Sequence, residues 1–352
     1  MFISRSILAA SIECPLIKHT AKATIGCRFH LKNNGKQDYS VLKWSTPLER
    51  KTSNCLTVTR NGKKLEYDGI YRKRGVPGPD QFLTVGPGQT LSSTFQVSDA
   101  FDMTKPGVYS VAVDTYLEYV IGSAASKPDI KRKIRHLSSP AVSFQIVGRG
   151  SSKGTLGQKA RFLESRRQTK QNRIFDGTFG DGVSRKKVLP KPPVIMGGTP
   201  ALKADTEKAH GIAYNTILSK FLADPEKKKL LVFTWFGINP VGNVALKFKQ
   251  ITDVLGKETI TYIFDGPDCD PGDYAYTTPY SRTIYLCGSY KTAKLSKGDD
   301  NKMGTLTHEL SHAVINTDDH TYSKNLCLQM AQKKPLLAID NANNFEYFVE
   351  AL

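Results

Sequence analysis

The sequence predicts a multidomain protein in which an all-β N-terminal domain is joined by a linker to a helix-rich α+β domain. Three observations support this prediction. Short β-rich runs separated by turn residues fill residues 1–147, and a basic stretch with several prolines, residues 148–200, follows them. In residues 201–352 the apolar residues recur mostly at helical spacing instead. A chain of 352 residues is also long enough to form two separate cores.

Residues 1–147 are predicted to fold as an immunoglobulin-like β-sandwich. The strongest local signal is Asn61-Gly62, which separates the strand-like runs Cys55–Arg60 and Lys63–Tyr67 and is typical of a tight β-hairpin. The other strand-like runs of this domain are Ala23–Leu31, Gln81–Val85, Leu91–Val97, Val108–Val113 and Ala141–Val147. Short strands at this spacing indicate a sandwich. No catalytic pattern occurs here, and the domain is a candidate pro-domain.

The start of the chain contains a short apolar run, residues 7–10, preceded by Arg5 and followed by Glu13. This run is shorter than the core of a normal signal peptide and far too short to cross a membrane. We therefore expect either a weak secretion signal or an incomplete start. No later segment is a candidate for a transmembrane span.

The linker, residues 148–200, contains basic clusters such as Arg166-Arg167 and Arg185-Lys186-Lys187. Two interpretations remain open: a site that is cut between a pro-domain and the second domain, or an uncut tether. The linker also holds much of the excess positive charge, which is +18 for the whole chain. No nucleic-acid-binding motif accompanies this charge, so we favour a solvated basic surface and expect no nucleic-acid partner, with a basic nucleic-acid binder as an alternative function.

The C-terminal region, residues 201–352, is predicted to consist mainly of helices with a few strands. Its expected helices are Ala204–Leu222, Val244–Leu255, Met303–Ile315 and Lys324–Gln332, and its expected strands are Thr259–Phe264 and Arg282–Leu286.

The chemistry of the sequence is concentrated in His308-Glu309-Leu310-Ser311-His312. On a helix, residues four positions apart lie on one face, so the imidazoles of His308 and His312 can bind the same metal ion. Glu309 lies beside the first histidine and can act on a water molecule at that ion. This pattern predicts a hydrolytic zinc site with one Zn²⁺ ion.

A catalytic zinc needs a third protein ligand, and the sequence offers several candidates. The metzincin pattern requires Gly at position 315 and His at position 318, where this chain has Ile315 and Asp318. A related pattern with an aspartate ligand would use Asp318, and a thermolysin-like arrangement would use Glu346 or Glu350. The remaining candidate is Asp319.

Residues 316–323, Asn-Thr-Asp-Asp-His-Thr-Tyr-Ser, resemble the Gly-Thr-x-Asp-x-x-Tyr-Gly motif of the aspzincins, the family of deuterolysin and peptidyl-Lys metalloendopeptidase. Asn316 and Ser323 replace the two glycines. The resemblance extends over about residues 200–352 and implies a zincin metalloprotease domain. It further implies that Asp319 is the third zinc ligand, that Glu309 is the general base, and that Tyr322 stabilises the oxyanion.

The same resemblance implies a disulfide and a substrate-binding region. It pairs Cys269 with Cys287, whereas two of the cysteines at positions 14, 27 and 55 could pair in the β domain and Cys327 is unassigned. Lysine-specific members have an aspartate where this chain has Asn343, so strict lysine preference does not follow. Asn343 and Glu346 are the candidate substrate-binding residues.

The sequence therefore predicts a secreted zinc endopeptidase that hydrolyses protein or peptide substrates with a metal-activated water and Glu309 as general base. The alternative from another functional class is a binding or structural protein that retains an inactive zincin fold. Intact candidate ligands and an intact Glu309 favour the enzyme.

Overall fold

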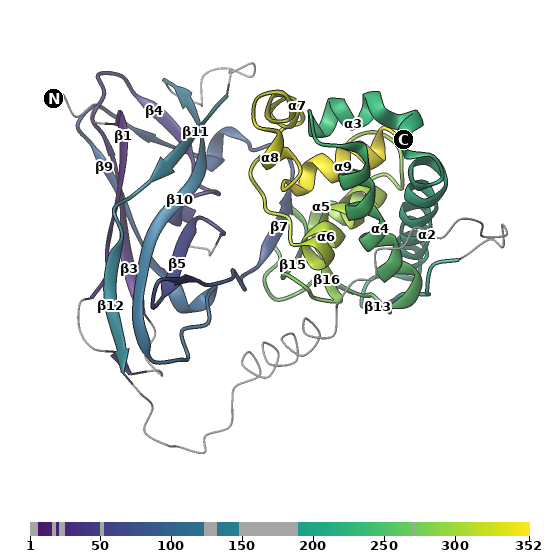
Figure 1. Cartoon of the computed structure of the whole chain (residues 1–352), viewed down its shortest axis with the longest axis horizontal. Helices are drawn as coiled ribbons and strands as arrows, with labels where there is room; N and C mark the ends of the chain where they lie inside the picture. The colour runs from purple at the N-terminus through teal and green to yellow at the C-terminus, as the bar shows by residue number, and fades with distance from the viewer. Residues whose placement is uncertain are drawn as a thin grey trace. The chain divides into compact units, whose positions relative to one another are not determined.

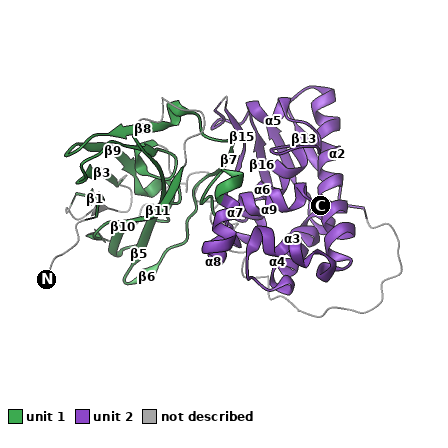
Figure 2. Ribbon diagram, turned by 90° about the horizontal axis from the view of Figure 1, so that it is seen from above, with its two compact units in different colours: residues 1–151, 318–326 green, residues 152–317, 327–352 purple. Residues whose placement is uncertain are grey.

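The computed structural model describes residues 6–15, 19–20, 25–49, 53–122, 132–147, 189–270 and 272–352 (Figure 1). The chain divides into two compact units (Figure 2). The first contains residues 1–151 and 318–326, and the second contains residues 152–317 and 327–352. Most of the predicted linker, residues 148–188, lies outside the described residues.

The first unit consists mainly of strands, as the sequence predicted for the N-terminal region. They are β1 (Leu8–Glu13), β2 (His19–Thr20), β3 (Gly26–Asn33), β4 (Tyr39–Leu42), β5 (Leu56–Arg60), β6 (Lys63–Lys64), β7 (Tyr71–Arg74), β8 (Phe82–Val85), β9 (Thr90–Gln96), β10 (Gly107–Ile121), β11 (Lys133–Ser138) and β12 (Val142–Val147). One sheet has the order β1-β3-β9, and all its pairs are antiparallel. In another sheet the long strand β10 pairs with β4, β5, β11 and β12.

Most of the apolar run near the start of the chain lies in β1. Leu8, Ala10 and Ile12 are buried, whereas the residues between them point outward to differing degrees. This alternation is that of a strand with one buried face. A disulfide between Cys14 and Cys27 then joins the end of β1 to β3.

The predicted hairpin at Asn61-Gly62 is confirmed. β5 and β6 pair antiparallel with Arg60 opposite Lys63, and Asn61 and Gly62 have φ values of 50° and 77°. Positive φ at both central residues is what a tight hairpin turn of this type requires, and Asn and Gly tolerate it best.

Glu118, on β10, is a buried carboxyl with a perturbed pKa. Its side chain is 2% exposed, and its Oε1 lies 3.5 Å from Nη1 of Arg132. Burial raises the pKa of Glu118 to about 7, although Arg132 and a hydrogen bond from Thr321 act in the opposite direction.

This raised pKa makes the stability of the protein pH-dependent. In the unfolded chain Glu118 loses its proton near its ordinary pKa of 4.5, whereas the folded chain retains it up to about pH 7. The free energy of unfolding should therefore fall by about 3 kcal/mol as the pH rises between these values. Glu118→Gln should remove this decrease in urea denaturation series, and the exposed-site control Glu207→Gln should retain it. An unchanged pH dependence in Glu118→Gln would contradict the assignment.

The second unit contains most of the helices, as the sequence predicted for the C-terminal region. Its elements, with α7 extending across the unit boundary, are β13 (Val194–Met196), α2 (Pro200–Thr216), the π-helical η5 (Ile217–Leu222), the 3-10 helix η6 (Pro225–Lys228), α3 (Lys229–Phe236), α4 (Val241–Lys257), β14 (Thr261–Phe264), β15 (Asp273–Thr277), β16 (Thr283–Leu286), α5 (Gly288–Thr292), α6 (Lys302–Ile315), α7 (Lys324–Lys333), α8 (Pro335–Ala338) and α9 (Ala342–Glu350). β14 pairs in parallel with β13 and β16, and β15 pairs antiparallel with β16.

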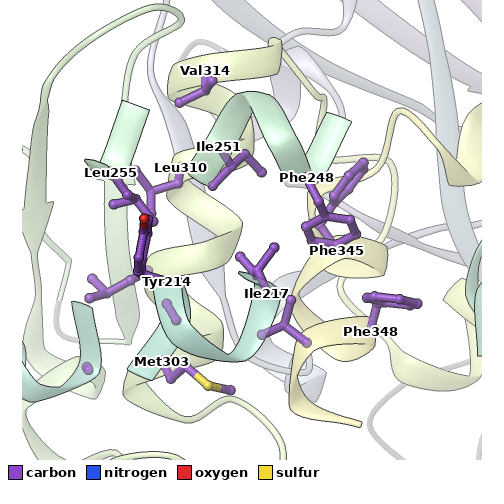
Figure 3. Packing of buried hydrophobic residues seen from close by; sticks show 14 of the residues in the cluster. Tyr214, Ile217, Phe248, Ile251, Leu255, Met303, Leu310, Val314, Phe345 and Phe348 are labelled. Carbon is purple, nitrogen blue, oxygen red and sulfur yellow. The ribbon is translucent and has the colours of Figure 1, made fainter. Parts of the chain in front are cut away.

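Helix α6 packs against α2, α4 and α9. Figure 3 shows Tyr214 of α2, Ile251 of α4, Leu310 of α6 and Phe345 of α9 around one apolar core, and all four side chains are buried. Burial of large apolar side chains on several helices is the main favourable term for a core of this kind. The core therefore fixes α6, which carries the predicted metal-binding histidines.

The predicted disulfide between Cys269 and Cys287 is confirmed, and it connects the loop after β14 to the end of β16. Cys55 and Cys327 are buried and belong to neither of these two disulfides. Among the described residues, no helix combines the length and apolar character that a membrane span requires.

Candidate metal centre

The two histidines of the sequence pattern lie in the middle of α6. The side chain of Asn301 caps the start of this helix by accepting a hydrogen bond from the backbone N–H of Gly304 at 2.8 Å. Asn316 ends the helix in the left-handed conformation, with φ 55° and ψ 45°. The family motif has a glycine at the position of Asn316. Asparagine is among the residues that adopt this left-handed conformation most readily.

The ring nitrogens of His308 and His312 converge. Their Nε2 atoms lie 3.1 Å apart, and the rings are nearly perpendicular at 82°. His312 Nδ1 lies 2.7 Å from the backbone oxygen of Thr317, to which a protonated Nδ1 donates a hydrogen bond. That tautomer leaves Nε2 with a lone pair that faces His308. The hydroxyl of Thr317 is itself 2.6 Å from that of Ser311, which fixes the loop after the helix.

The carboxylate of Glu346 lies beside the other histidine. Its Oε2 lies 3.3 Å from Nδ1 of His308, and both side chains are fully buried. A proton on Nδ1 is therefore placed toward the carboxylate, and Nε2 presents a lone pair on the opposite side of the ring. Helix α9, which carries Glu346, is attached to α3 through Asn344, whose Nδ2 donates to the backbone oxygen of Trp235 at 2.5 Å.

Asp319 completes a set of three potential ligands. The donor atoms of His308, His312 and Asp319 all lie within 4.8 Å of one another. Two imidazole lone pairs at 3.1 Å repel each other unless a cation or a shared proton lies between them. Two nitrogens and a carboxylate oxygen are suitable ligands for Zn²⁺, and a catalytic zinc site uses three protein ligands. The residues present therefore fit a zinc ion.

The other acidic candidates for the third ligand have different neighbours. Asp318 Oδ2 accepts a hydrogen bond from Nδ2 of Asn54 at 2.7 Å, and its Oδ1 accepts from the backbone N–H of Asp319. Glu346 meets His308 at Nδ1, the nitrogen that points away from His312. Glu350 Oε1 accepts from the backbone N–H of Asn301.

The remaining predicted site residues are also buried. Glu309, on the same helix, is fully buried, and so is Asn343, one turn before Glu346 on α9. Tyr322 packs at right angles against Trp44, with 5.2 Å between ring centroids, and burial raises its pKa well above the ordinary value. Thr317, whose backbone oxygen faces His312 Nδ1, is a residue of the site that sequence reasoning missed. Its place in the Thr-x-Asp motif was the signal that could have identified it.

Comparison with known proteins places these residues in a family. The model of the aspzincin M35 family, described as lysine-specific metallo-endopeptidase, matches residues 222–350. A peptidyl-Lys metalloendopeptidase of Armillaria mellea is 34% identical over 296 residues, which cover 82% of this chain and 74% of that protein. An extracellular protease of Aeromonas hydrophila is 27% identical over 337 residues, covering 91% of this chain and 86% of that protein.

A third relative, a peptidyl-Lys metalloendopeptidase of Pleurotus ostreatus, is 35% identical over 120 residues, covering 33% of this chain and 71% of that protein. The 34% identity with the Armillaria protein, which extends over 74% of that protein, agrees with the family match. The convergence of the two histidines agrees with it as well. The chain belongs to the aspzincin family of zinc-dependent metalloendopeptidases.

Proposed function

We propose that this metalloendopeptidase is secreted, that it cleaves protein or peptide substrates, and that Glu309 is its general base. The observation that carries the proposal is the convergence of the Nε2 atoms of His308 and His312 at 3.1 Å, with a donor atom of Asp319 within 4.8 Å. We assign these three residues as the ligands of one zinc ion.

Each ligand has a distinct role in this assignment. His308 and His312 donate through Nε2, because their Nδ1 atoms face Glu346 and the backbone oxygen of Thr317. Asp319 supplies a negative charge that partly balances the cation. When bound, zinc polarises the scissile carbonyl and lowers the pKa of a water molecule.

Glu309 follows His308 directly on α6, so the helix holds it next to the ligands. Its carboxylate takes a proton from the attacking water and later delivers it to the leaving amine. Its complete burial favours proton transfer, because few bulk water molecules can compete for the carboxylate.

Tyr322 and Asn343 have roles in substrate binding in this proposal. The Tyr322 hydroxyl donates a hydrogen bond to the developing oxyanion, and Trp44 holds the ring edge-on. Asn343 and the neighbouring Glu346 are the candidates for contact with a polar substrate side chain such as lysine. The relatives named peptidyl-Lys metalloendopeptidase motivate the test of that preference.

The domain assignment completes the proposal. Residues 1–147 form an immunoglobulin-like sandwich that serves as a pro-domain, residues 148–200 form the linker, and residues 201–352 form the zincin catalytic domain. Secretion is supported by the two disulfides, which are typical of oxidising compartments, and by the extracellular protease among the relatives.

Removing the metal should test this function. Treatment of the full chain with a chelator should abolish cleavage of a peptide library, and addition of one equivalent of Zn²⁺ should restore it, because the bound ion activates the attacking water. Mass spectrometry of the products would also give the residues beside each cleaved bond. Cleavage that persists in the metal-free protein would contradict the proposal, whereas cleavage without lysine preference would exclude only that preference.

The orienting role of Glu346 can be tested separately. Glu346→Gln keeps the size of the side chain but removes the negative charge that lies 3.3 Å from His308 Nδ1. We expect zinc affinity to fall by about 10- to 100-fold, as is usual when the partner of a ligand histidine is changed. Competition with a chromogenic chelator would measure this fall, and the exposed-site control Glu207→Gln should bind zinc normally. Unchanged affinity in Glu346→Gln would exclude the orienting role.

A further inference from the structure

Four large apolar side chains are strongly exposed near α3 and α8. Leu230 is 84% exposed, Ile238 80%, Leu336 79% and Phe233 55%. Leu230 and Phe233 lie one turn apart on α3, Ile238 follows the end of that helix, and Leu336 lies on α8. Such exposures mean that these side chains project from the surface. Single exposed apolar residues are common, but a group of them needs a physical reason.

The structure holds these side chains in one region of the second unit. Helix α3 packs against α8. After α3, Asn239 Nδ2 donates to the backbone oxygen of Pro335 at 2.7 Å, which ties the residue next to Ile238 to the residue next to Leu336. Gly237, with φ 64°, lies so close to α7 and α8 that a Cβ atom would be 2.0 Å from the backbone oxygen of Ala331. Figure 2 shows α3 and α8 at the same edge of this unit.

Helix α3 is held in place by its inner face, so its outer face does not need to pack against the core. Val232, Trp235 and Phe236 are buried and belong to the core of the second unit. Leu230 and Phe233 point to the opposite side of the helix. The helix is therefore anchored by one apolar face while a second apolar face meets solvent. An ordinary surface helix would carry polar residues there.

Lysines flank the projecting side chains on both elements. They are Lys227, Lys228 and Lys229 at the start of α3, and Lys333 and Lys334 just before α8. Among them Lys228 is half-buried and the others are exposed. Asp224 forms an ion pair with Lys227 at 2.9 Å, and Glu226 is the other acidic residue of this stretch. With Asp340 just after α8 included, five lysines against three carboxylates leave the region positively charged.

We propose that Leu230, Phe233, Ile238 and Leu336, with the lysines that flank them, bind the surface of an anionic phospholipid bilayer. Projecting apolar side chains enter the boundary between headgroups and acyl chains, and lysines beside them interact with anionic headgroups. A fluid bilayer accepts separate projecting side chains, whereas a protein partner would need a matching set of pockets. This interaction is independent of the zinc site and adds to the proposed peptidase function.

Vesicle co-sedimentation of the full chain would test the proposal. The chain should bind vesicles of phosphatidylcholine with phosphatidylglycerol and should bind vesicles of phosphatidylcholine alone much more weakly. The variant Leu230→Ser/Ile238→Ser/Leu336→Ser should lose at least about tenfold in affinity for the anionic vesicles. Lys333→Gln/Lys334→Gln should lose roughly fivefold or more, and high salt should weaken binding of the unchanged chain.

Matched controls separate this surface from general effects of charge and exposure. Lys203→Gln/Lys208→Gln removes two exposed lysines of α2, and Val108→Ser removes an exposed apolar residue of the first unit. Both should retain vesicle binding, and every variant should cleave a soluble peptide normally. Absence of binding to anionic vesicles, or equal binding by the triple serine variant, would overturn the proposal. Concentration-dependent dimers that the triple variant abolishes would overturn it in favour of a second copy of the chain.

Discussion

Replacing Glu309 with glutamine should abolish detectable peptide hydrolysis while one zinc ion remains bound per chain. The substitution keeps the shape of a fully buried side chain on α6 and leaves His308 and His312 unchanged. It removes the carboxylate that accepts the proton of the attacking water, and loss of such a group usually lowers the rate by about 100- to 10,000-fold. Metal analysis and the initial rate of peptide cleavage, measured on the same preparation, would give both results.

The combination of these two measurements distinguishes an enzyme from an inactive protein with the same fold. An unchanged chain that binds zinc but cleaves no peptide would support the alternative of a binding or structural protein. Normal cleavage by Glu309→Gln would exclude the proposed mechanism. Loss of zinc in this variant would instead show that the substitution disturbs α6, and circular dichroism of Glu309→Gln would reveal that disturbance.

Removing the carboxylate of Asp319 should have a different effect from removing that of its neighbour. Asp319→Ala should lower zinc affinity by more than about 100-fold, because a direct ligand contributes more than the residues that orient ligands. Asp318→Ala should keep zinc, because Asp318 bonds to Asn54 and to the backbone N–H of residue 319. Chelator competition on both proteins would measure the difference.

The two aspartate variants form a matched pair, since they differ only in which of two adjacent carboxylates is absent. Zinc loss in Asp318→Ala together with zinc retention in Asp319→Ala would move the third ligand by one residue. Zinc retention in both variants would exclude both aspartates. In the second case the third ligand of the zinc ion would have to be a residue other than these two aspartates.

Several features followed from local sequence or from the family resemblance. The spacing of His308 and His312 placed both imidazoles on one face of a helix, because residues four apart lie almost above one another. Asn61-Gly62 predicted a hairpin, since the tight turn requires two residues that tolerate positive φ. The pairing of Cys269 with Cys287 followed from the resemblance to known proteases and is also found in the structure.

Other features depend on pairing with distant segments and could not be derived from local sequence. The apolar run at residues 7–10 is too short for a signal core, and its strand character depends on pairing with β3. Strand β10 extends to Ile121, well beyond the predicted Val108–Val113, because its second half pairs with β4 and β11. Neither partner can be identified from the periodicity of one segment.

The sequence by itself predicted that α6 is a helix and that His308 and His312 lie on one of its faces with Glu309 beside them. These positions depend only on helical periodicity. Only the tertiary structure placed a carboxylate oxygen of Asp319 within 4.8 Å of the histidine nitrogens and placed Glu346 beside Nδ1 of His308. The position of Asp319 depends on the path of the chain after the left-handed Asn316, and the position of Glu346 depends on the packing of α9 against α6. Contacts between residues far apart in sequence are decided by the whole core rather than by local spacing.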